Sequence, residues 1–412
     1  MIDRLYKNTL LEMLEIFPVV AVIGPRQVGK STLVQLPEIQ AGRRYISLDD
    51  LGQRSVAETD PKSFLGGEES LIVDEVQLVP GLLREIKRLV DIRRTPGRFL
   101  LTGSADLDHC ADISHVLAGR VGLLRLPPLL LTEKRNGNLW KPLFTVESIE
   151  ELEKQVRNVS VDSFRWEDLL SGGFPLSVES KSTRGRTHWF DSFQTTYLER
   201  DLRRVSDISN LADFVRLMKL SAAETGTLLN QAHLARAAGL KPMTAGRYLS
   251  VLEASLLIEK IPPFVTNIGK RFVKSPKLYW TDTGLCAFLN GFTHVDQLKE
   301  SHTYKGRFFE SLVMMEMKGL LPLLEEPASL FHLRTHDQLE IDGLLQVGRR
   351  QVLIEVKASQ TVTAKDAAPI EKWLTLQPKP GFGVVIYAGT EVFRLSSHVL
   401  ALPLMSLCSS GS

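Results

Sequence analysis

Residues 24–31 have the sequence Gly-Pro-Arg-Gln-Val-Gly-Lys-Ser, and the apolar run Val19–Ile23 precedes them. This is the pattern of a phosphate-binding loop (P-loop) between a β-strand and an α-helix. Its glycines allow successive backbone N–H groups to converge on an anion, and the N-terminus of the helix adds partial positive charge. The pattern therefore predicts an α/β domain that binds a nucleotide at this loop. The expected nucleotide-binding residues are Gly24, Pro25, Arg26, Gln27, Val28, Gly29, Lys30, Ser31 and Thr32.

A second apolar run, Leu71–Val73, ends in the adjacent acids Asp74 and Glu75. A continuous apolar run is typical of a strand that is buried on both faces. Downstream of a P-loop, such an acidic pair predicts hydrolysis of ATP with Mg²⁺. Asp74 and Ser31 would hold the metal, and Glu75 would activate the attacking water. Lys30 would contact the β- and γ-phosphates.

Two more strands are expected at Arg98–Ser104 and Val121–Leu126. Thr102 and Ser104, at the end of the first, are candidates for sensing the γ-phosphate. The alternative is a simple exit of the strand into a turn. Arg120 directly precedes the second strand, where ring-forming ATPases carry an arginine finger that reaches the neighbouring subunit's nucleotide. The alternative role for Arg120 is an ion pair at the surface or with the lid.

Several segments carry a resemblance to a known family. The segments GPRQVGKS, YISLDD, LIVDEVQ, FLLTGSAD and LAGRVGLLRLPPL resemble the AAA-superfamily P-loop ATPases found as stand-alone proteins in bacteria and archaea. The similarity continues through GGFP at 172–175, YLERDL at 197–202 and LYWTDTGL at 278–285, so it covers nearly the whole chain. It implies an ATPase core joined to a C-terminal nuclease-like domain of undefined role.

The middle of the chain changes character twice. Residues 136–160 are polar, which favours a loop or insertion, and residues 162–222 have the pattern of a helical lid. Residues 224–285 then contain a helix, a glycine turn, a second helix and two strands, which predicts a winged helix. In DNA readers of this type the second helix enters the major groove and the wing contacts phosphate. The alternative is a packing or dimerisation module. The candidate DNA-binding residues are Lys241, Thr244, Arg247, Lys270, Arg271 and Lys274.

The last part of the chain carries a group of acids and a lysine. Glu310 lies near the start of an amphipathic helix, and Asp342, Glu355 and Lys357 lie on the two strands of a predicted hairpin. Side chains two residues apart on a strand share a face, so Glu355 and Lys357 project together. These residues resemble a PD-(D/E)xK nuclease site, in which Asp342 and Glu355 would bind metal. An inactive platform for DNA or protein remains the alternative. The tail at 406–412 is expected to be disordered.

The sequence thus predicts an α/β fold with four parts. They are a P-loop core of the AAA type at residues 1–135, a helical lid and linker at 136–223, a winged helix at 224–290, and a PD-(D/E)xK nuclease-like domain at 300–405.

The composition limits which binding partners and which compartment can be expected. The formal net charge of +2 neither favours nor excludes nucleic acid. The three cysteines form no motif, the N-terminus has no secretory pattern, and no apolar run reaches the length of a transmembrane helix. We therefore expect a cytoplasmic protein without a membrane partner. The predicted function is Mg²⁺-dependent ATP hydrolysis that acts on DNA. Several copies of the chain are expected to associate, and a ring is one form of such an assembly. The alternative is an ATP-driven regulatory switch whose C-terminal parts bind a partner or promoter without nuclease activity.

Overall fold

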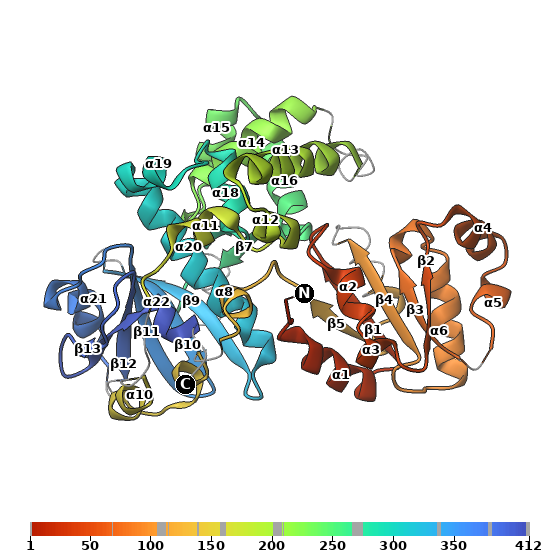
Figure 1. Cartoon of the computed structure of the whole chain (residues 1–412), viewed down its shortest axis with the longest axis horizontal. Helices are drawn as coiled ribbons and strands as arrows, with labels where there is room; N and C mark the ends of the chain where they lie inside the picture. The colour runs from red at the N-terminus through yellow and green to blue at the C-terminus, as the bar shows by residue number, and fades with distance from the viewer. Residues whose placement is uncertain are drawn as a thin grey trace.

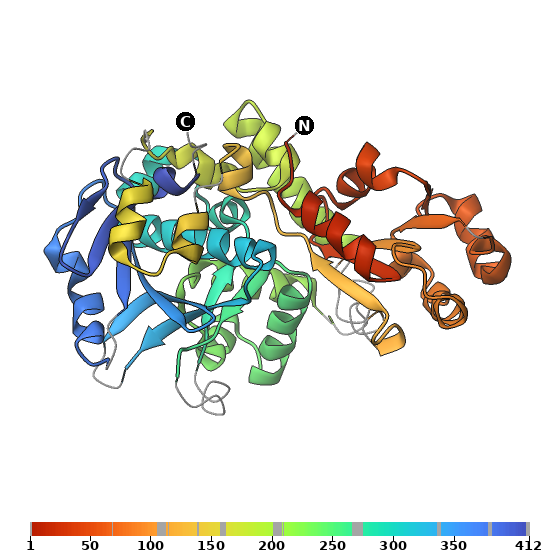
Figure 2. The same cartoon turned by 90° about the horizontal axis from the view of Figure 1, so that it is seen from below.

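The structure is a computed structural model of the 412-residue chain. It describes residues 2–408 except 68, 105–112, 114, 138–139, 157–161, 201–207, 209, 266–274, 336–338 and 378–380. Figure 1 shows a first sheet at one end of the molecule, a second sheet at the other end, and a group of helices that includes α14, α15 and α18 above the second sheet. Figure 2 gives the same arrangement from below.

The first sheet contains five parallel strands in the order β2-β3-β4-β1-β5. Because the strands are parallel, the ends of β1, β3 and β4 meet at one edge, which carries the P-loop and Asp74. The strands are β1 (Val19–Gly24), β2 (Arg43–Ser47), β3 (Ser70–Asp74), β4 (Phe99–Ser104) and β5 (Val121–Arg125). The helices of this part are α1 (Tyr6–Ile16), α2 (Lys30–Val34), α3 (Pro37–Gln40), α4 (Leu51–Thr59), α5 (Pro61–Phe64), α6 (Leu82–Ile92) and α8 (Leu131–Lys134), with a 3-10 turn η1 (Val76–Leu78).

Helices cover both faces of this sheet. Alternate residues of β1 enter two separate apolar cores, Val19 and Ala21 with α6, and Val20 and Val22 with α1 and α2. Both residue sets are fully buried. A strand covered on both faces has no polar side, which explains the continuous apolar run before the P-loop.

The middle part is mainly helical. Its helices are α9 (Lys141–Thr145), α10 (Ile149–Val156), α11 (Trp166–Ser171), α12 (Pro175–Glu179), α13 (Thr183–Arg200), α14 (Leu211–Ala223), α15 (Gln231–Ala238), α16 (Pro242–Ala254), α18 (Thr283–Leu289) and α19 (Val295–Glu300). A small antiparallel sheet has the order β6-β8-β7, with β6 (Thr227–Leu228), β7 (Ile258–Ile261) and β8 (Lys277–Trp280). Gly239 ends α15 in a left-handed conformation, so α16 follows α15 after a tight turn.

The C-terminal part is a six-stranded mixed sheet in the order β13-β14-β12-β11-β10-β9. The strands are β9 (Ala328–Arg334), β10 (Glu340–Val347), β11 (Arg350–Lys357), β12 (Phe382–Tyr387), β13 (Phe393–Arg394) and β14 (Val399–Pro403). The helices are α20 (His302–Leu320), α21 (Ala364–Leu374) and α22 (Leu404–Cys408), with a 3-10 turn η2 (Leu321–Leu323) after α20. The pairing of β10 with β9 shifts register between Ile341 and Leu344, so the regular ladder is interrupted at Asp342 and Gly343.

Two expectations from the sequence are wrong. The segment 136–160 contains the helices α9 and α10, because Ile149, Leu152 and Val156 repeat at helical spacing and join the large core. The start of the tail is not disordered, because Ser406 is buried within α22 and donates a hydrogen bond to the Pro403 carbonyl. Residues 409–412 lie outside the described part of the chain.

Candidate functional site

The P-loop follows β1 and leads directly into α2. Gly29 precedes the helix with a φ of 97°, a left-handed conformation that favours glycine. Lys30 is the first helical residue and is only 5% exposed. Its ammonium group donates to the carbonyl oxygens of Gly24 and Pro25, at 3.1 and 2.9 Å. The lysine is therefore held inside the loop, where a phosphate group would meet it.

Asp74 lies at the centre of a polar network at the edge of the sheet. The Ser31 hydroxyl donates to both of its carboxylate oxygens, at 3.0 and 3.1 Å. Tyr45 on β2 donates to Oδ2 at 2.8 Å, and Thr102 on β4 donates to Oδ1. Burial and the bond to Asp74 raise the pKa of the Tyr45 phenol well above its usual range. Three neighbouring strands thus fix the position of one buried carboxylate.

Glu75 follows Asp74 in a left-handed conformation, with a φ of 58°. This conformation is uncommon for a residue with a side chain and costs free energy. The Glu75 amide donates to the Thr102 hydroxyl at 3.2 Å, and the side chain of Gln77 donates to the Glu75 carboxylate. Thr102 therefore bonds both acids of the pair, while the Ser104 side chain lies outside the described part of the chain.

A cavity of about 730 Å³ opens beside these residues. Residues 26–33 of the P-loop and Glu75 form one wall, and Pro175, Leu176 and Glu179 of α12 form another. The volume lies within the range of small-molecule sites. Of the predicted nucleotide-binding residues, Arg26, Gln27, Val28, Gly29, Lys30, Ser31 and Thr32 line it.

The GGFP segment places α12 over the P-loop. The Gly173 amide donates to the Asp282 carboxylate at 2.5 Å, and the Gly173 carbonyl accepts from Leu129 at 2.7 Å. A Cβ atom at Gly173 would lie 2.2 Å from the Leu129 carbonyl oxygen, so only glycine permits this approach. The next residues, Phe174 and Pro175, turn into α12 at the cavity wall.

The oxygen set at the P-loop fits a magnesium ion. The Ser31 hydroxyl and the Asp74 carboxylate lie within 3.0 Å of each other at the cavity side of the sheet. Mg²⁺ prefers oxygen ligands and usually binds through one or two protein groups together with phosphates. Ser31 and Asp74 are the groups that would hold it.

Arg120 occupies the opposite edge of the sheet. It precedes β5, and its carbonyl accepts from the amide of Val19 at the start of β1. Its side chain donates to Asp91 at 2.6 Å and to the Ala118 carbonyl at 2.7 Å. Arg120 therefore cannot contact the nucleotide site of its own chain, and the predicted role across a subunit boundary stays a prediction.

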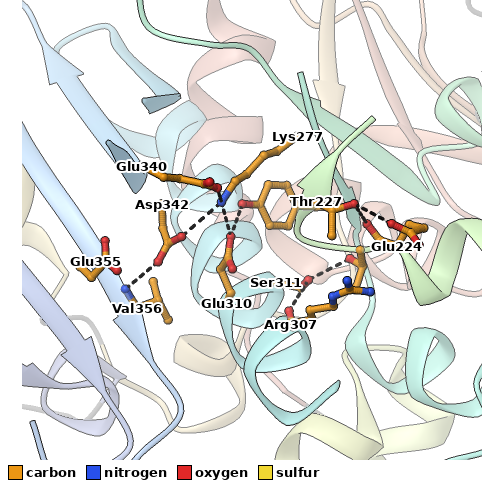
Figure 3. A network of polar contacts seen from close by, with 12 residues as sticks. Glu224, Thr227, Lys277, Arg307, Glu310, Ser311, Glu340, Asp342, Glu355 and Val356 are labelled. Atoms are coloured by element: carbon orange, nitrogen blue, oxygen red, sulfur yellow. Dashed lines mark hydrogen bonds and ion pairs between the residues drawn. The ribbon is translucent and has the colours of Figure 1, made fainter. Parts of the chain in front are cut away.

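Two of the four predicted nuclease-like residues, Glu310 and Asp342, contact a lysine that was not predicted as a site residue (Figure 3). Lys277 on β8 lies 3.0 Å from Glu310, 3.1 Å from Glu340 and 3.2 Å from Asp342. The Tyr279 hydroxyl donates to Glu310 at 2.6 Å. The other two predicted residues form their own pair, with Lys357 2.6 Å from Glu355.

The burial and close approach of these charged side chains shift their pKa values. Burial, then the nearby Asp342, raise the pKa of Glu310 to about 7 and that of Glu355 to about 8. Burial lowers the pKa of Lys277, but Glu310, Asp342 and Glu340 outweigh it and raise that pKa above its usual value. The lysine is thus a buried cation that the carboxylates keep charged.

This arrangement does not fit the expected metal site. Among the residues that the structure describes, no group of three or more His, Cys, Asp or Glu side chains is arranged to hold a metal ion. Instead, an ammonium group lies between Glu310 and Asp342, two of the four predicted residues.

The candidate DNA-binding residues divide into two groups. Lys241 and Arg247 are exposed on α16, and Thr244 between them is half-buried. Met243 on the same helix is 85% exposed. The other three candidates, Lys270, Arg271 and Lys274, lie outside the described residues.

Comparison with known proteins relates the whole chain to two others. An uncharacterised protein of Mycobacterium tuberculosis is 31% identical over 403 residues, which is 96% of this chain and 82% of that protein. An uncharacterised protein of Mycobacterium bovis gives the same values. The chain belongs to the same family as these mycobacterial proteins.

The parts of the chain match separate domain families. Residues 17–134 match the AAA domain, and residues 165–296 and 305–407 match two domains of unknown function, DUF8612 and DUF4143. Together with the P-loop and the Asp74–Glu75 pair, the first match identifies an AAA-superfamily P-loop ATPase.

Two solved structures are similar at low identity. The Walker-type ATPase of Pyrococcus abyssi is 15% identical, with a TM-score of 0.40, 70% of this chain covered and 96% of that one. The RuvB Holliday junction branch migration motor of Thermotoga maritima is 20% identical, with a TM-score of 0.30 and coverages of 63% and 90%.

Other residues of this family member hold its ATPase part in place. The Arg4 guanidinium donates to the Val28 carbonyl of the P-loop at 3.0 Å and bonds Glu133 at the same distance. Glu316 on α20 accepts from the Leu131 and Thr132 amides at the start of α8. No short motif predicts these contacts. All of them except Arg4–Val28 join residues more than a hundred positions apart. None of the helices that the structure describes is long and apolar enough to cross a membrane.

Proposed function

We propose that this P-loop ATPase hydrolyses Mg²⁺-ATP in the cavity between the P-loop and α12, and that the cycle acts on DNA bound at the α15–α16 unit. The network that joins Ser31, Asp74 and Thr102 beside Lys30 carries the first part of this proposal. Lys30, Ser31 and Glu75 line the cavity, and the Asp74 carboxylate accepts the Ser31 hydroxyl behind them, which supports this assignment.

In the proposed reaction the phosphates replace the partners that Lys30 has now. Its ammonium group exchanges the Gly24 and Pro25 carbonyls for phosphate oxygens, and the P-loop amides bind the remaining charge. Mg²⁺, when bound, neutralises developing charge on the β- and γ-phosphate oxygens. The apolar side chains of Ile2, Leu129 and Leu176 in the same cavity offer a surface for the base.

Glu75 is the proposed base. Its carboxylate accepts from Gln77 at one oxygen, and the other oxygen would accept a hydrogen bond from the attacking water. The strained backbone at Glu75 aims the side chain at the cavity, because the residue leaves β3 in a left-handed turn.

Paired variants test this assignment. Lys30→Ala should lose nucleotide binding, whereas Glu75→Gln should bind ATP normally and hydrolyse it about 10²- to 10⁴-fold more slowly. Binding is measured by calorimetry and turnover by phosphate release. Normal turnover in Glu75→Gln would refute the role of this residue.

Action on DNA rests on the arrangement of α15, α16 and the β6-β8-β7 sheet. These elements have the order of a winged helix, and two basic residues, Lys241 at the N-cap of α16 and Arg247 within it, are exposed. The proposal includes contacts from Lys270, Arg271 and Lys274 in the connection between β7 and β8.

The test compares ATP turnover without DNA and with single-stranded, duplex and branched DNA. We expect stimulation by one of these forms, and Lys241→Ala/Arg247→Ala should lower DNA affinity and reduce the salt slope by about 2. Arg84→Ala/Lys87→Ala on α6 is the matched control, because it removes the same charge from an exposed helix of the other part. No DNA binding at low salt would exclude this part of the proposal.

A second candidate is a switch without nuclease activity, in which the nucleotide state controls partner or promoter binding. Its specific support is the Lys277 ammonium group between Glu310 and Asp342, where cleavage would need a metal. DNA-dependent ATP turnover without any Mg²⁺-dependent cleavage would favour this candidate. Cleavage that Asp342→Ala or Glu355→Ala abolishes would exclude it.

A further inference from the structure

Lys277 belongs to a different part of the chain from the carboxylates that it binds. The lysine begins β8 of the small sheet, whereas Glu310 lies on α20, and Glu340 and Asp342 lie on β10 of the C-terminal sheet. Its side chain is only 3% exposed, and the other residues of β8 are apolar or aromatic. Figure 3 shows its ammonium group between the three carboxylates.

The ammonium group is matched to these partners. It has three N–H donors, and three carboxylates lie within 3.0–3.2 Å of it. Tyr279 donates to the same oxygen of Glu310 as Lys277 does, and the Val356 amide donates to the other oxygen of Asp342 at 3.0 Å. The three carboxylates therefore form a cation site, and the cation in it is the side chain of Lys277.

The four carboxylates Glu310, Glu340, Asp342 and Glu355 outnumber the two lysines beside them, because Lys277 bonds the first three and Lys357 bonds only one oxygen of Glu355. Glu355 is 7% exposed and lies beside Asp342, and its Oε2 has no hydrogen-bond partner within the described part of the chain. A buried, unpartnered carboxylate oxygen is costly unless a cation or donor reaches it. The group therefore has unused capacity for a cation on the side of Glu355.

We propose that Lys277 acts as a tethered cation that closes the Glu310–Asp342–Glu355 group against divalent metal while β8 is docked on the C-terminal sheet. A metal ion would have to share carboxylates with a positive charge about 3 Å away, which is strongly repulsive in a buried site. The contact of β8 with the C-terminal part therefore limits what the acids can bind, independently of ATP hydrolysis at the P-loop.

Metal binding to the full-length protein tests this proposal without any need for catalysis. All variants carry Asp74→Asn, so that the P-loop does not contribute, and Mn²⁺ binding is counted by electron paramagnetic resonance without nucleotide. The parent should bind no Mn²⁺ ion that depends on Asp342. Lys277→Met should gain one ion at least about tenfold more tightly than the parent, and adding Asp342→Asn should remove it.

Lys318→Met is the matched control. Lys318 on α20 also bridges the same two parts of the chain, through Glu259 on β7 at 3.2 Å, but with a single carboxylate and greater exposure. Its loss should leave Mn²⁺ binding unchanged. If Lys277→Met does not fold, Lys277→Gln replaces it, because its amide removes the charge and still donates to the acids.

Two results would overturn the proposal. One is a folded Lys277 variant that binds no more Mn²⁺ than the parent. The other is a parent that already binds an Mn²⁺ ion which Asp342→Asn removes, and this result needs no Lys277 variant. Loss of ATP turnover in Lys30→Ala bears only on the P-loop site, so failure of either proposal is distinguishable from failure of the other.

Discussion

At the scale of single residues, Asp74 shows how much of the site a local motif contains. Its place after a buried strand was predictable, because the apolar run and the acid pair are adjacent in sequence. Thr102 was also recognised as a candidate, because it ends the next buried strand. Tyr45 was not, although it donates to the same carboxylate at 2.8 Å. Nothing in its own surroundings indicates a partner 29 residues away.

We predict that Tyr45→Phe and Thr102→Val lower the turnover number about tenfold to a hundredfold with little change in KM. Each removes a hydrogen bond to a charged group, which contributes about 1.5–3 kcal/mol. Both residues position Asp74 and would not touch the nucleotide, so the effect should fall on the turnover number. Steady-state kinetics checks this, and an altered KM with normal turnover would contradict it.

Lys277 was not predictable as a site residue for a related reason. A nuclease-like pattern directs attention to acids on α20 and β10, and the lysine reaches them from β8, which lies 33 residues before Glu310. One signal was available. A charged residue at the start of a short strand that is otherwise apolar and aromatic must find a buried partner.

At the scale of elements, β9 packs against the segment that joins β7 to β8. His332 on β9 is 2% exposed, its amide donates to the Pro262 carbonyl at 3.0 Å, and its Nε2 lies 3.2 Å from the Ser275 carbonyl oxygen. Burial, then the positive charge of Lys277, lower the pKa of His332 to about 4. The unfolded chain therefore takes up this proton at higher pH than the folded chain does.

This difference predicts acid sensitivity of the interface. The contribution of the neutral His332 to the free energy of unfolding is complete above pH 6.5 and is lost as the pH falls toward 4. Between pH 7.5 and pH 5 it falls by about 2 kcal/mol. His332→Asn keeps a donor for Ser275 and does not titrate, so its free energy of unfolding should fall less over the same range. Denaturant titrations at the two pH values measure this. Equal pH dependence in both proteins would show that His332 is not the group responsible.

At the scale of the whole molecule, the largest apolar core is continuous from α8 through the helical part to the C-terminal sheet. The two cores around the P-loop sheet are separate from it. The division into predicted parts followed from changes of pattern along the chain, such as helical spacing giving way to strands. The contacts between the parts were not predictable, because they join residues far apart and have no periodicity.

Arg120 lies at the sheet edge opposite its own P-loop, so the predicted arginine-finger role requires a second copy of the chain. We predict that Arg120→Ala lowers ATP turnover by a factor of about 10³ or more at concentrations where the protein assembles. Mixing Arg120→Ala with Lys30→Ala should restore part of the activity, since one interface then combines an intact P-loop with an intact arginine.

Asp91→Ala serves as the control for this experiment, because it removes the partner of the 2.6 Å ion pair and keeps the arginine. Its turnover should remain close to that of the parent. An Arg120→Ala variant with unchanged turnover in the assembled state would leave the surface ion pair as the role of this residue.

The contacts of helix α8 affect the order in which the chain can fold during its synthesis. Its first amides bond Glu316 on α20, and its Thr132 hydroxyl lies 3.8 Å from the Cys408 sulfur on α22. Domains generally fold as units while the chain emerges from the ribosome. Here a helix that follows the ATPase strands directly cannot acquire its buried partners until residues near 316 and 408 have been synthesised. Helix α8 therefore stays incompletely packed until these residues have emerged, although the two cores around the P-loop sheet are separate from it.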